Sequence, residues 1–241
     1  MKEALTALAQ FGYDGVELTL EHPELNPDFA GRWEVDKLKK FLNDLELEAS
    51  AVSFHGKRAG WEMKRLKCRA GLQLAHDLEV KAFISSSCMG GGEEKFAEMR
   101  GFSEDMCLVA EKLGVDFAVE PEPGTLINGS REMSALIDTV DSRHLKINLD
   151  VGHSFLTEGD VRADILRWGS LIVHTHIEDI KGKDHSHLLP GEGELDFRLI
   201  FSAFDEIDYY GFFTLDLFDI QDNPKDMARI GIEALWQKMT A

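Results

Sequence analysis

Basic residues and long apolar runs are scarce in this 241-residue sequence. It contains 26 Lys and Arg against 44 Asp and Glu, so its formal net charge is −18. Binding to a nucleic-acid backbone or to an anionic membrane surface depends on clustered Lys and Arg, and the charge therefore argues against both partners. No apolar run approaches the roughly 20 residues that cross a bilayer, and the opening MKEALTALAQ lacks a signal-peptide core. We therefore expect a cytoplasmic protein.

Cysteines and linker-like segments are also rare. The three cysteines, Cys68, Cys88 and Cys107, are odd in number and widely spaced. This pattern is typical of reduced thiols and not of a disulfide framework or a cysteine-based zinc site. No stretch rich in Pro, Ser and Gly divides the sequence. We therefore expect a single domain over residues 1–241, which is long enough to bury one large core.

Short apolar stretches alternate with longer amphipathic segments along the chain. This alternation is typical of successive strand and helix units around a parallel sheet. The predicted strands are Gly15–Leu20, Leu47–Phe54, Val80–Ser86, Val115–Glu120, Leu145–Val151, Leu171–Ile177 and Phe212–Phe218. The predicted helices lie near residues 2–10, 34–45, 62–78, 94–113, 131–140, 160–168, 196–206 and 224–239.

Seven strands interleaved with helices in a chain of this length predict an α/β fold, a (β/α) TIM barrel. A dinucleotide-binding sheet would need a glycine fingerprint after its first strand, and GVELTLEH offers none. Because the sequence opens with a helix, the predicted barrel lacks its first strand. Either a neighbouring element or another chain would fill that gap, and an uncovered parallel edge favours a homo-oligomer.

Side chains of metal-ligand type stand at the ends of four consecutive predicted strands. In (β/α) barrels the active site forms at the carboxyl ends of the strands. A carboxylate buried there without a partner is costly, and a divalent cation would remove that cost. Carboxylates and imidazoles suit Mn²⁺, Mg²⁺, Co²⁺ or Zn²⁺. The candidate ligands are Glu120, Glu122, Asp150, His153, His174, His176, Asp179 and Asp216.

Strand alternation separates some of these candidates. If His176 points into the barrel, His174 points the same way one layer deeper. Glu120 and Glu122 also share one side of their strand, but Pro121 is expected to end the strand between them. Glu120 is therefore the better ligand, and Glu122 is expected at the rim of the pocket.

Five motifs, in this order, resemble those of the xylose isomerase-like barrels. FGYDGVEL resembles the family's second strand, VEPEPG, LDVGH and VHTHIED resemble later strands, and HSHLLPGEGELDF resembles the loop that follows. The family includes sugar and sugar-phosphate isomerases and epimerases, hydroxypyruvate isomerase, inosose dehydratase and the endonuclease IV branch. The resemblance covers nearly the whole chain and agrees with an absent first strand.

The resemblance implies one divalent metal ion and a pair of catalytic carboxylates. The family's Glu, Asp, His and Glu ligands fall on Glu120, Asp150, His176 and Asp216, where Asp stands in place of the last Glu. In the family's isomerases and epimerases, the first and last carboxylates exchange the proton at the carbon next to the carbonyl. Glu120 and Asp216 are therefore predicted to be catalytic as well as metal-binding.

Further polar residues are expected around this centre. His153 resembles the family histidine that contacts substrate, although satisfied core histidines would explain such positions equally well. Substrate contacts are predicted for His55, His153, Glu122 and His187. Supporting roles behind the ligands or in the adjoining loop are predicted for His174 and Asp179.

The leading interpretation is a metal-dependent isomerase or epimerase of a small polyhydroxy carbonyl compound, such as a sugar or sugar phosphate. An inosose-type dehydratase would use the same metal and base to remove a β-hydroxyl as water. The absent strand and Asp216 also leave open a degenerate barrel that binds a ligand without turnover. Phosphodiester hydrolysis in the manner of endonuclease IV is disfavoured by the net charge of −18.

Overall fold

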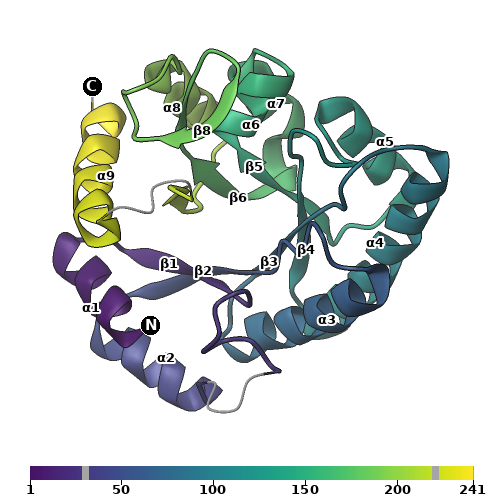
Figure 1. Cartoon of the computed structure of the whole chain (residues 1–241), viewed down its shortest axis with the longest axis horizontal. Helices are drawn as coiled ribbons and strands as arrows, with labels where there is room; N and C mark the ends of the chain where they lie inside the picture. The colour runs from purple at the N-terminus through teal and green to yellow at the C-terminus, as the bar shows by residue number, and fades with distance from the viewer. Residues whose placement is uncertain (29–32, 219–222, 241) are drawn as a thin grey trace.

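A computed structural model describes residues 1–28, 33–218 and 223–240 (Figure 1). The strands of its main sheet are β1 (Gly15–Thr19), β2 (Glu48–Ser53), β3 (Ala82–Ser86), β4 (Asp116–Glu120), β5 (Leu145–Asp150), β6 (Ile172–Ile177) and β9 (Phe213–Leu215). The α-helices are α1 (Lys2–Phe11), α2 (Val35–Asp44), α3 (Trp61–Asp77), α4 (Glu93–Leu113), α5 (Ser130–Val140), α6 (Val151–Thr157), α7 (Val161–Trp168), α8 (Phe197–Glu206) and α9 (Pro224–Met239). A 3₁₀ turn, Gly169–Leu171, precedes β6.

In the described part of the chain, seven parallel strands form one sheet in the order β1-β2-β3-β4-β5-β6-β9. The sheet curves into a nearly closed barrel with the helices outside it (Figure 1). Each of these strands lies within its predicted range, and each predicted helix is found within one residue of its expected ends. The predicted (β/α) barrel of seven strands is therefore confirmed.

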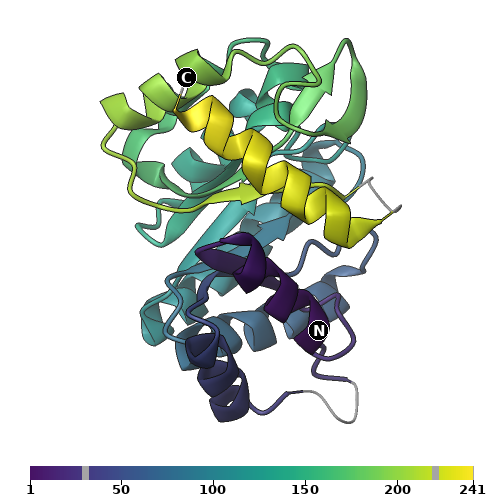
Figure 2. The same ribbon diagram turned by 90° about the vertical axis from the view of Figure 1, so that its left-hand side faces the viewer.

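The barrel is open between β1 and β9. Across the described ranges, β1 pairs only with β2, and β9 pairs only with β6. Helices α1 and α9 lie side by side over this opening (Figure 2), and the Tyr13 hydroxyl donates a 2.7 Å hydrogen bond to the Ala228 carbonyl of α9. A cavity of about 1130 Å³ runs from these helices to the strand ends. Coverage of the opening by a second copy of the chain stays a prediction.

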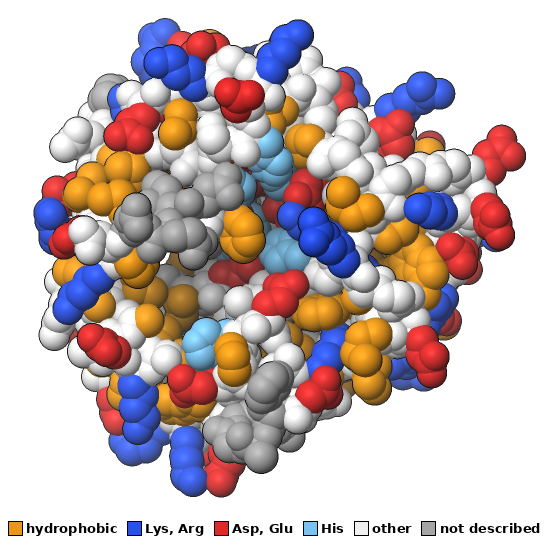
Figure 3. Space-filling view, in the orientation of Figure 1, with side chains coloured by type: hydrophobic (Ala, Val, Ile, Leu, Met, Phe, Trp, Pro, Cys, Tyr) orange, Lys and Arg blue, Asp and Glu red, His pale blue; other side chains and the backbone are white. Residues whose placement is uncertain are grey.

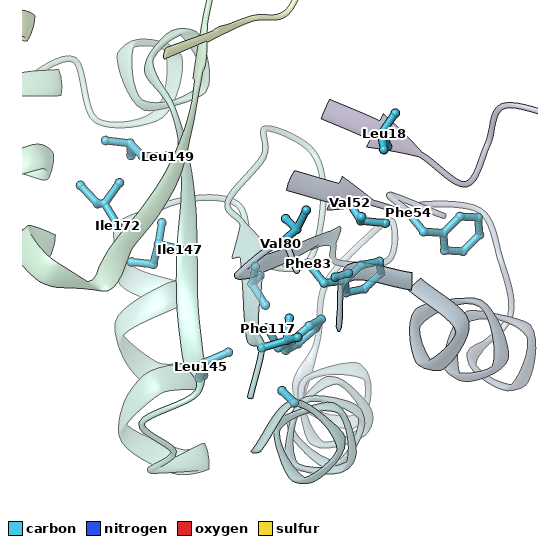
Figure 4. Packing of buried hydrophobic residues seen from close by; sticks show 14 of the residues in the cluster. Leu18, Val52, Phe54, Val80, Phe83, Phe117, Leu145, Ile147, Leu149 and Ile172 are labelled. Atoms are coloured by element: carbon cyan, nitrogen blue, oxygen red, sulfur yellow. The ribbon is translucent and has the colours of Figure 1, made fainter. Parts of the chain in front are cut away.

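The hydrophobic core lies between the outer face of the strands and the helices (Figure 4). In β4, Phe117 and Val119 belong to this core, and the Phe117 ring lies 6.4 Å from that of Phe83 in β3. Ala118 alternates with them and packs inside the barrel in a separate cluster of aliphatic residues. Because Glu120 shares the parity of Ala118, it also points inward. Strand alternation thus aims the polar strand ends at the barrel interior.

An antiparallel hairpin outside the main sheet is absent from the predicted elements. Strands β7 (Asp179–Lys181) and β8 (Asp184–Leu188) pair with each other and turn at Gly182, where φ is 68°. Polar residues occupy both faces of this hairpin, so the sequence shows no apolar alternation there. The hairpin folds over the strand ends and brings its own histidines to them.

Two smaller differences also have local causes. Helix α6 has seven residues, too few for a helical period to show in the sequence, and it begins where the Asp150 side chain accepts a hydrogen bond from the His153 amide. Strand β9 ends at Leu215 instead of Phe218, because its pairing with β6 ends there, at the last residue of β6. Both differences affect the chain next to predicted metal ligands.

None of the helices in the described ranges is both long enough and apolar enough to span a bilayer. The cysteines are thiols in the structure, with Cys68 and Cys107 buried and Cys88 half-buried. Burial raises the pKa of Cys68 to about 11, so this thiol stays protonated at neutral pH.

Gly71 on α3 is expected to tolerate no side chain. A Cβ atom there would lie 2.1 Å from Cε2 of Phe83, which is fully buried. Although alanine is the better helix former, we expect Gly71→Ala to lower the free energy of unfolding by about 1–3 kcal/mol through overpacking. Urea unfolding measures the change. Gly101→Ala on α4 is the matched control, since a Cβ there meets nothing within 4 Å; an equal or higher stability of Gly71→Ala would mean that Phe83 moves aside.

Candidate metal centre

Three carboxylates from neighbouring strands converge on one ring nitrogen of His176. Its Nδ1 atom lies 2.9 Å from Glu120 Oε1, 3.7 Å from Asp216 Oδ2 and 3.9 Å from Asp150 Oδ2. Glu120 and Asp150 end β4 and β5, His176 is the penultimate residue of β6, and Asp216 directly follows β9. Parallel strands therefore bring the four predicted ligands to one place.

This group has the charge and the unsatisfied atoms of a cation site. The side chains of Glu120, Asp150 and His176 are at most 4% exposed. Asp150 Oδ2 has no hydrogen-bond partner among the described residues. Burial raises the pKa of Asp216, whereas nearby imidazoles overcome the effect of burial on Glu120 and hold its pKa well below the usual range. Three carboxylates and one imidazole fit a divalent ion, and the shorter Asp216 still reaches the group.

The other ring nitrogen of His176 faces a further carboxylate. Glu17, in the middle of β1, places Oε2 2.8 Å from His176 Nε2 and 3.2 Å from His174 Nε2. The same nitrogen of His174 lies 3.0 Å from the Thr214 hydroxyl of β9. Burial alone would raise the pKa of Glu17, but the His176 imidazole and the contacting histidines hold it well below its usual range. Glu17 is therefore a partly buried anion directly behind the predicted metal ligand.

A second group of ligand-type side chains lies beside Asp216. His187 Nδ1 is 2.5 Å from Glu178 Oε2 and 3.6 Å from Asp216 Oδ1, and His153 Nε2 is 2.9 Å from His185 Nε2. The three histidines and Glu178 are close enough together to hold a cation. Burial raises the pKa of the Glu178 carboxyl. This buried carboxyl therefore needs either a proton or a positive charge beside it.

His55 and Glu122 stand at the side of the same centre. His55 Nδ1 lies 3.0 Å from Glu120 Oε2 and 2.9 Å from the Ser86 hydroxyl, so it fixes the orientation of the Glu120 carboxylate. Glu122 is 4% exposed and forms an ion pair with Lys57. Its carboxylate is therefore buried and ion-paired, whereas the sequence places it at the rim of the pocket.

An open hollow in the surface gives access to these groups. Figure 3 shows histidine and acidic side chains at the bottom of a central depression, with basic side chains at its edge. The polar residues that line the cavity at the strand ends include His55, Lys57, Glu120, His153, His176, His187 and Asp216. A small polar ligand can therefore reach the predicted metal ligands and the histidines together.

Asp179 organises the loop that follows the hairpin. Its fully buried carboxylate accepts hydrogen bonds of 2.7–3.1 Å from the amides of Ile180, Gly191, Gly193 and Leu195. A Cβ at residue 193 would lie 2.3 Å from Asp179 Oδ1, so the close approach of the loop requires glycine there. The PGEG segment thus folds around one carboxylate at the edge of the site.

Replacing Asp179 is expected to unfold this loop and weaken the whole barrel. Asp179→Ala leaves four amides without their acceptor, and each costs about 1–3 kcal/mol, so we expect the free energy of unfolding to fall by at least about 3 kcal/mol. Urea unfolding measures the loss. Asp196→Ala is the matched control: it removes the cap of α8, a single bond to the Leu199 amide worth about 1 kcal/mol. Equal losses in the two variants would contradict the role of Asp179.

Sequence reasoning does not single out Glu17, Glu178 or His185. The signal for Glu17 is a charged residue inside the otherwise apolar strand GVELTL. Glu178 follows His176 by two residues, and His185 precedes His187 by two, so strand alternation would place each pair on one side. These patterns can be interpreted only when the side to which the neighbouring histidine points is known.

The sequence of this chain is similar to a family of known proteins and to several of their members. The chain matches the xylose isomerase-like TIM barrel family over residues 5–238. It is 29% identical over 117 residues to hydroxypyruvate isomerase of Escherichia coli strain K12, covering 48% of this chain and 42% of that protein. It is 20% identical over 250 residues to inosose dehydratase of Clostridium beijerinckii, covering 89% of this chain and 81% of that protein. The first curated relatives are matched over less than half of their own length.

A solved structure of the IOLI protein with a bound zinc atom has the same fold. Its TM-score with this chain is 0.83 at 16% sequence identity. The match covers 100% of this chain and 93% of the IOLI chain. The likeness at that identity concerns the fold. Together with the family match, which spans almost the entire sequence, it confirms the resemblance seen in the motifs: the chain belongs to the xylose isomerase-like TIM barrel family.

Proposed function

We propose that the protein is a metal-dependent isomerase or epimerase of a small sugar or sugar phosphate. The observation that supports this most directly is the convergence of Glu120, Asp150 and Asp216 on Nδ1 of His176 at the bottom of an open cavity. The family includes metal-dependent isomerases, epimerases and dehydratases. The substrate, the metal and the residue roles are part of the proposal.

Glu120, Asp150, His176 and Asp216 would hold one divalent ion. The zinc atom of the IOLI protein supports a divalent ion in this fold, and the mixed oxygen and nitrogen donors suit Mn²⁺, Mg²⁺, Co²⁺ or Zn²⁺. When bound, the ion supplies Lewis-acid polarisation of the substrate's carbonyl and hydroxyl oxygens, which acidifies the neighbouring C–H.

The two catalytic carboxylates, Glu120 and Asp216, then move the proton. They reach the centre from strands that are separated by β5 and β6 in the sheet, so a substrate carbon can have a carboxylate on each side. Isomerisation returns the proton to the adjacent carbon, and epimerisation returns it to the opposite face of the same carbon. His55 holds one oxygen of Glu120 at 3.0 Å, which leaves the other oxygen to face the centre.

Side chains around the cavity would bind the hydroxyl groups of the substrate. His153 and His187 line it on the hairpin side and His55 lines it on the β2 side. Lys57 stands at the mouth, paired with Glu122. These groups donate and accept hydrogen bonds, as a polyhydroxy compound requires, and no nucleic acid or membrane partner is proposed.

Dehydration is the second candidate reaction, because the dehydratase relative matches 89% of the chain. It shares the removal of the proton next to the carbonyl, after which a β-hydroxyl leaves as water. His153 or His187 would protonate that leaving hydroxyl from the cavity wall. A degenerate barrel, in contrast, would bind a ligand and exchange no proton.

Proton exchange in D₂O distinguishes these reactions. The metal-loaded protein is incubated with ketoses, aldoses, hydroxypyruvate and inososes, and proton NMR follows both label and product. An isomerase or epimerase gives a new carbonyl compound with deuterium next to the carbonyl, whereas a dehydratase gives an unsaturated product. A metal-loaded protein that exchanges no proton in any of these compounds would contradict the proposed function.

A further inference from the structure

We infer that Glu17 is the positioning residue of the metal-binding histidine: its carboxylate accepts the Nε2 hydrogen of His176 and thereby directs the Nδ1 lone pair at the ion. The inference rests on the proposed function, since it requires an ion at the His176 centre. It assigns a role to a strand residue that lies on the opposite side of the barrel opening from β9.

The two nitrogens of His176 have different surroundings. A neutral imidazole that binds a metal through Nδ1 carries its hydrogen on Nε2. Glu17 Oε2 lies 2.8 Å from that nitrogen, and a carboxylate oxygen accepts such a hydrogen. The Nδ1 atom faces Glu120 at 2.9 Å. Glu17 and the proposed ion therefore lie at opposite ends of one imidazole, an arrangement that fixes ring orientation and raises ligand basicity.

The ion belongs on the Nδ1 side and not beside Glu17. Glu17, His174 and His176 could themselves hold a cation, but this side offers one carboxylate against three on the other. His174 already contacts the Thr214 hydroxyl at 3.0 Å. On the Nδ1 side, Asp150 Oδ2 is buried and lacks a hydrogen-bond partner in the described ranges. The unsatisfied acceptor marks the side where positive charge is needed.

The Glu17 side chain is itself fixed in position, as a residue that orients the His176 ring must be. Its neighbour Leu18 is 2% exposed and anchors β1 in the hydrophobic core, while strand alternation turns Glu17 inward, where its side chain is 13% exposed. Oε2 contacts two histidines of β6, His174 and His176. One carboxylate thus ties β1 to β6 through the barrel interior.

The test compares metal binding by Glu17→Gln with that of a matched charge-loss variant. Glu21→Gln removes the same charge from the same cavity, but the Glu21 carboxylate is bonded to the Gly56 amide and the Thr19 hydroxyl instead of a predicted ligand. Competition with a chelator gives the dissociation constant for Zn²⁺. We expect a value about 10- to 100-fold higher for Glu17→Gln and a wild-type value for Glu21→Gln.

A second readout separates positioning from direct coordination and from folding. With Co²⁺ bound, Glu17→Gln is expected to keep the wild-type visible absorption bands, since the four ligands are unchanged, and the metal-free variant should retain a cooperative thermal transition. If Glu17→Gln does not fold, Glu17→Asp, which retracts the carboxylate by one methylene, takes its place in the same comparison.

Three outcomes would overturn the inference. An unchanged Zn²⁺ affinity would remove the positioning role, and altered Co²⁺ bands would make Glu17 a ligand instead. Equal losses of affinity in Glu17→Gln and Glu21→Gln would reduce the effect to general electrostatics. Failure of the wild-type protein to bind any divalent ion would overturn the proposed function itself. This failure is distinguishable from the other three outcomes, because it is measured on the wild-type protein before any variant is compared.

Discussion

His176→Ala is expected to abolish tight binding of the divalent ion. The three carboxylates of the predicted centre all lie within 4 Å of His176 Nδ1, so the substitution removes the only nitrogen donor proposed for the ion. Loss of a residue behind a metal ligand typically costs about 10- to 100-fold in affinity, and loss of the ligand itself should raise the dissociation constant by more than about 100-fold. Elemental analysis after reconstitution and dialysis measures the ion per chain.

His144→Ala is the matched control for this experiment. His144 also pairs with a carboxylate, at 3.1 Å from Asp116 Oδ1, but it precedes β5 and therefore lies at the barrel end opposite the proposed centre. We expect it to retain one ion per chain, like the wild type. A His176→Ala protein that keeps its ion with unchanged affinity would contradict the four-ligand centre and favour the other histidine groups as the binding site.

Glu120→Gln is expected to lower the turnover number by about 10²- to 10⁴-fold, the usual contribution of a general base. An amide can still offer an oxygen to the ion, but it cannot accept the substrate proton. We therefore expect a retained ion together with loss of deuterium exchange at the carbon next to the carbonyl. Metal content is measured on the same sample, so that loss of the ion is not mistaken for loss of the base.

Two further variants complete this comparison. Asp216→Asn removes the second proposed proton carrier and should impair turnover by a similar mechanism. Glu21→Gln, at the cavity wall, should turn over at the wild-type rate because its carboxylate is engaged by the Gly56 amide. A metal-loaded Glu120→Gln protein with wild-type exchange would show that a different group takes the proton.

The ring of strands could be predicted because it depends on local patterns. Alternation in segments such as DFAVE separates residues that face the helices from residues that face the inside of the barrel. The amphipathic helices are long enough for the helical period to show in the sequence. The same patterns put Glu120, Asp150 and His176 at consecutive strand ends, where parallel topology gathers them. The hairpin β7–β8 could not be predicted, because its sequence shows no alternation between an apolar face and a polar face.

Sequence alone therefore determined the seven-stranded barrel and four metal-ligand candidates. Tertiary structure decided what surrounds them. Glu17 and His176 are 159 positions apart, and Lys57 forms an ion pair with Glu122 from a separate loop. Such contacts depend on how closed the barrel is and on which way each ring turns. The periodicity of the sequence predicts which side of a strand a residue faces, whereas the atoms that its side chain contacts depend on the tertiary packing.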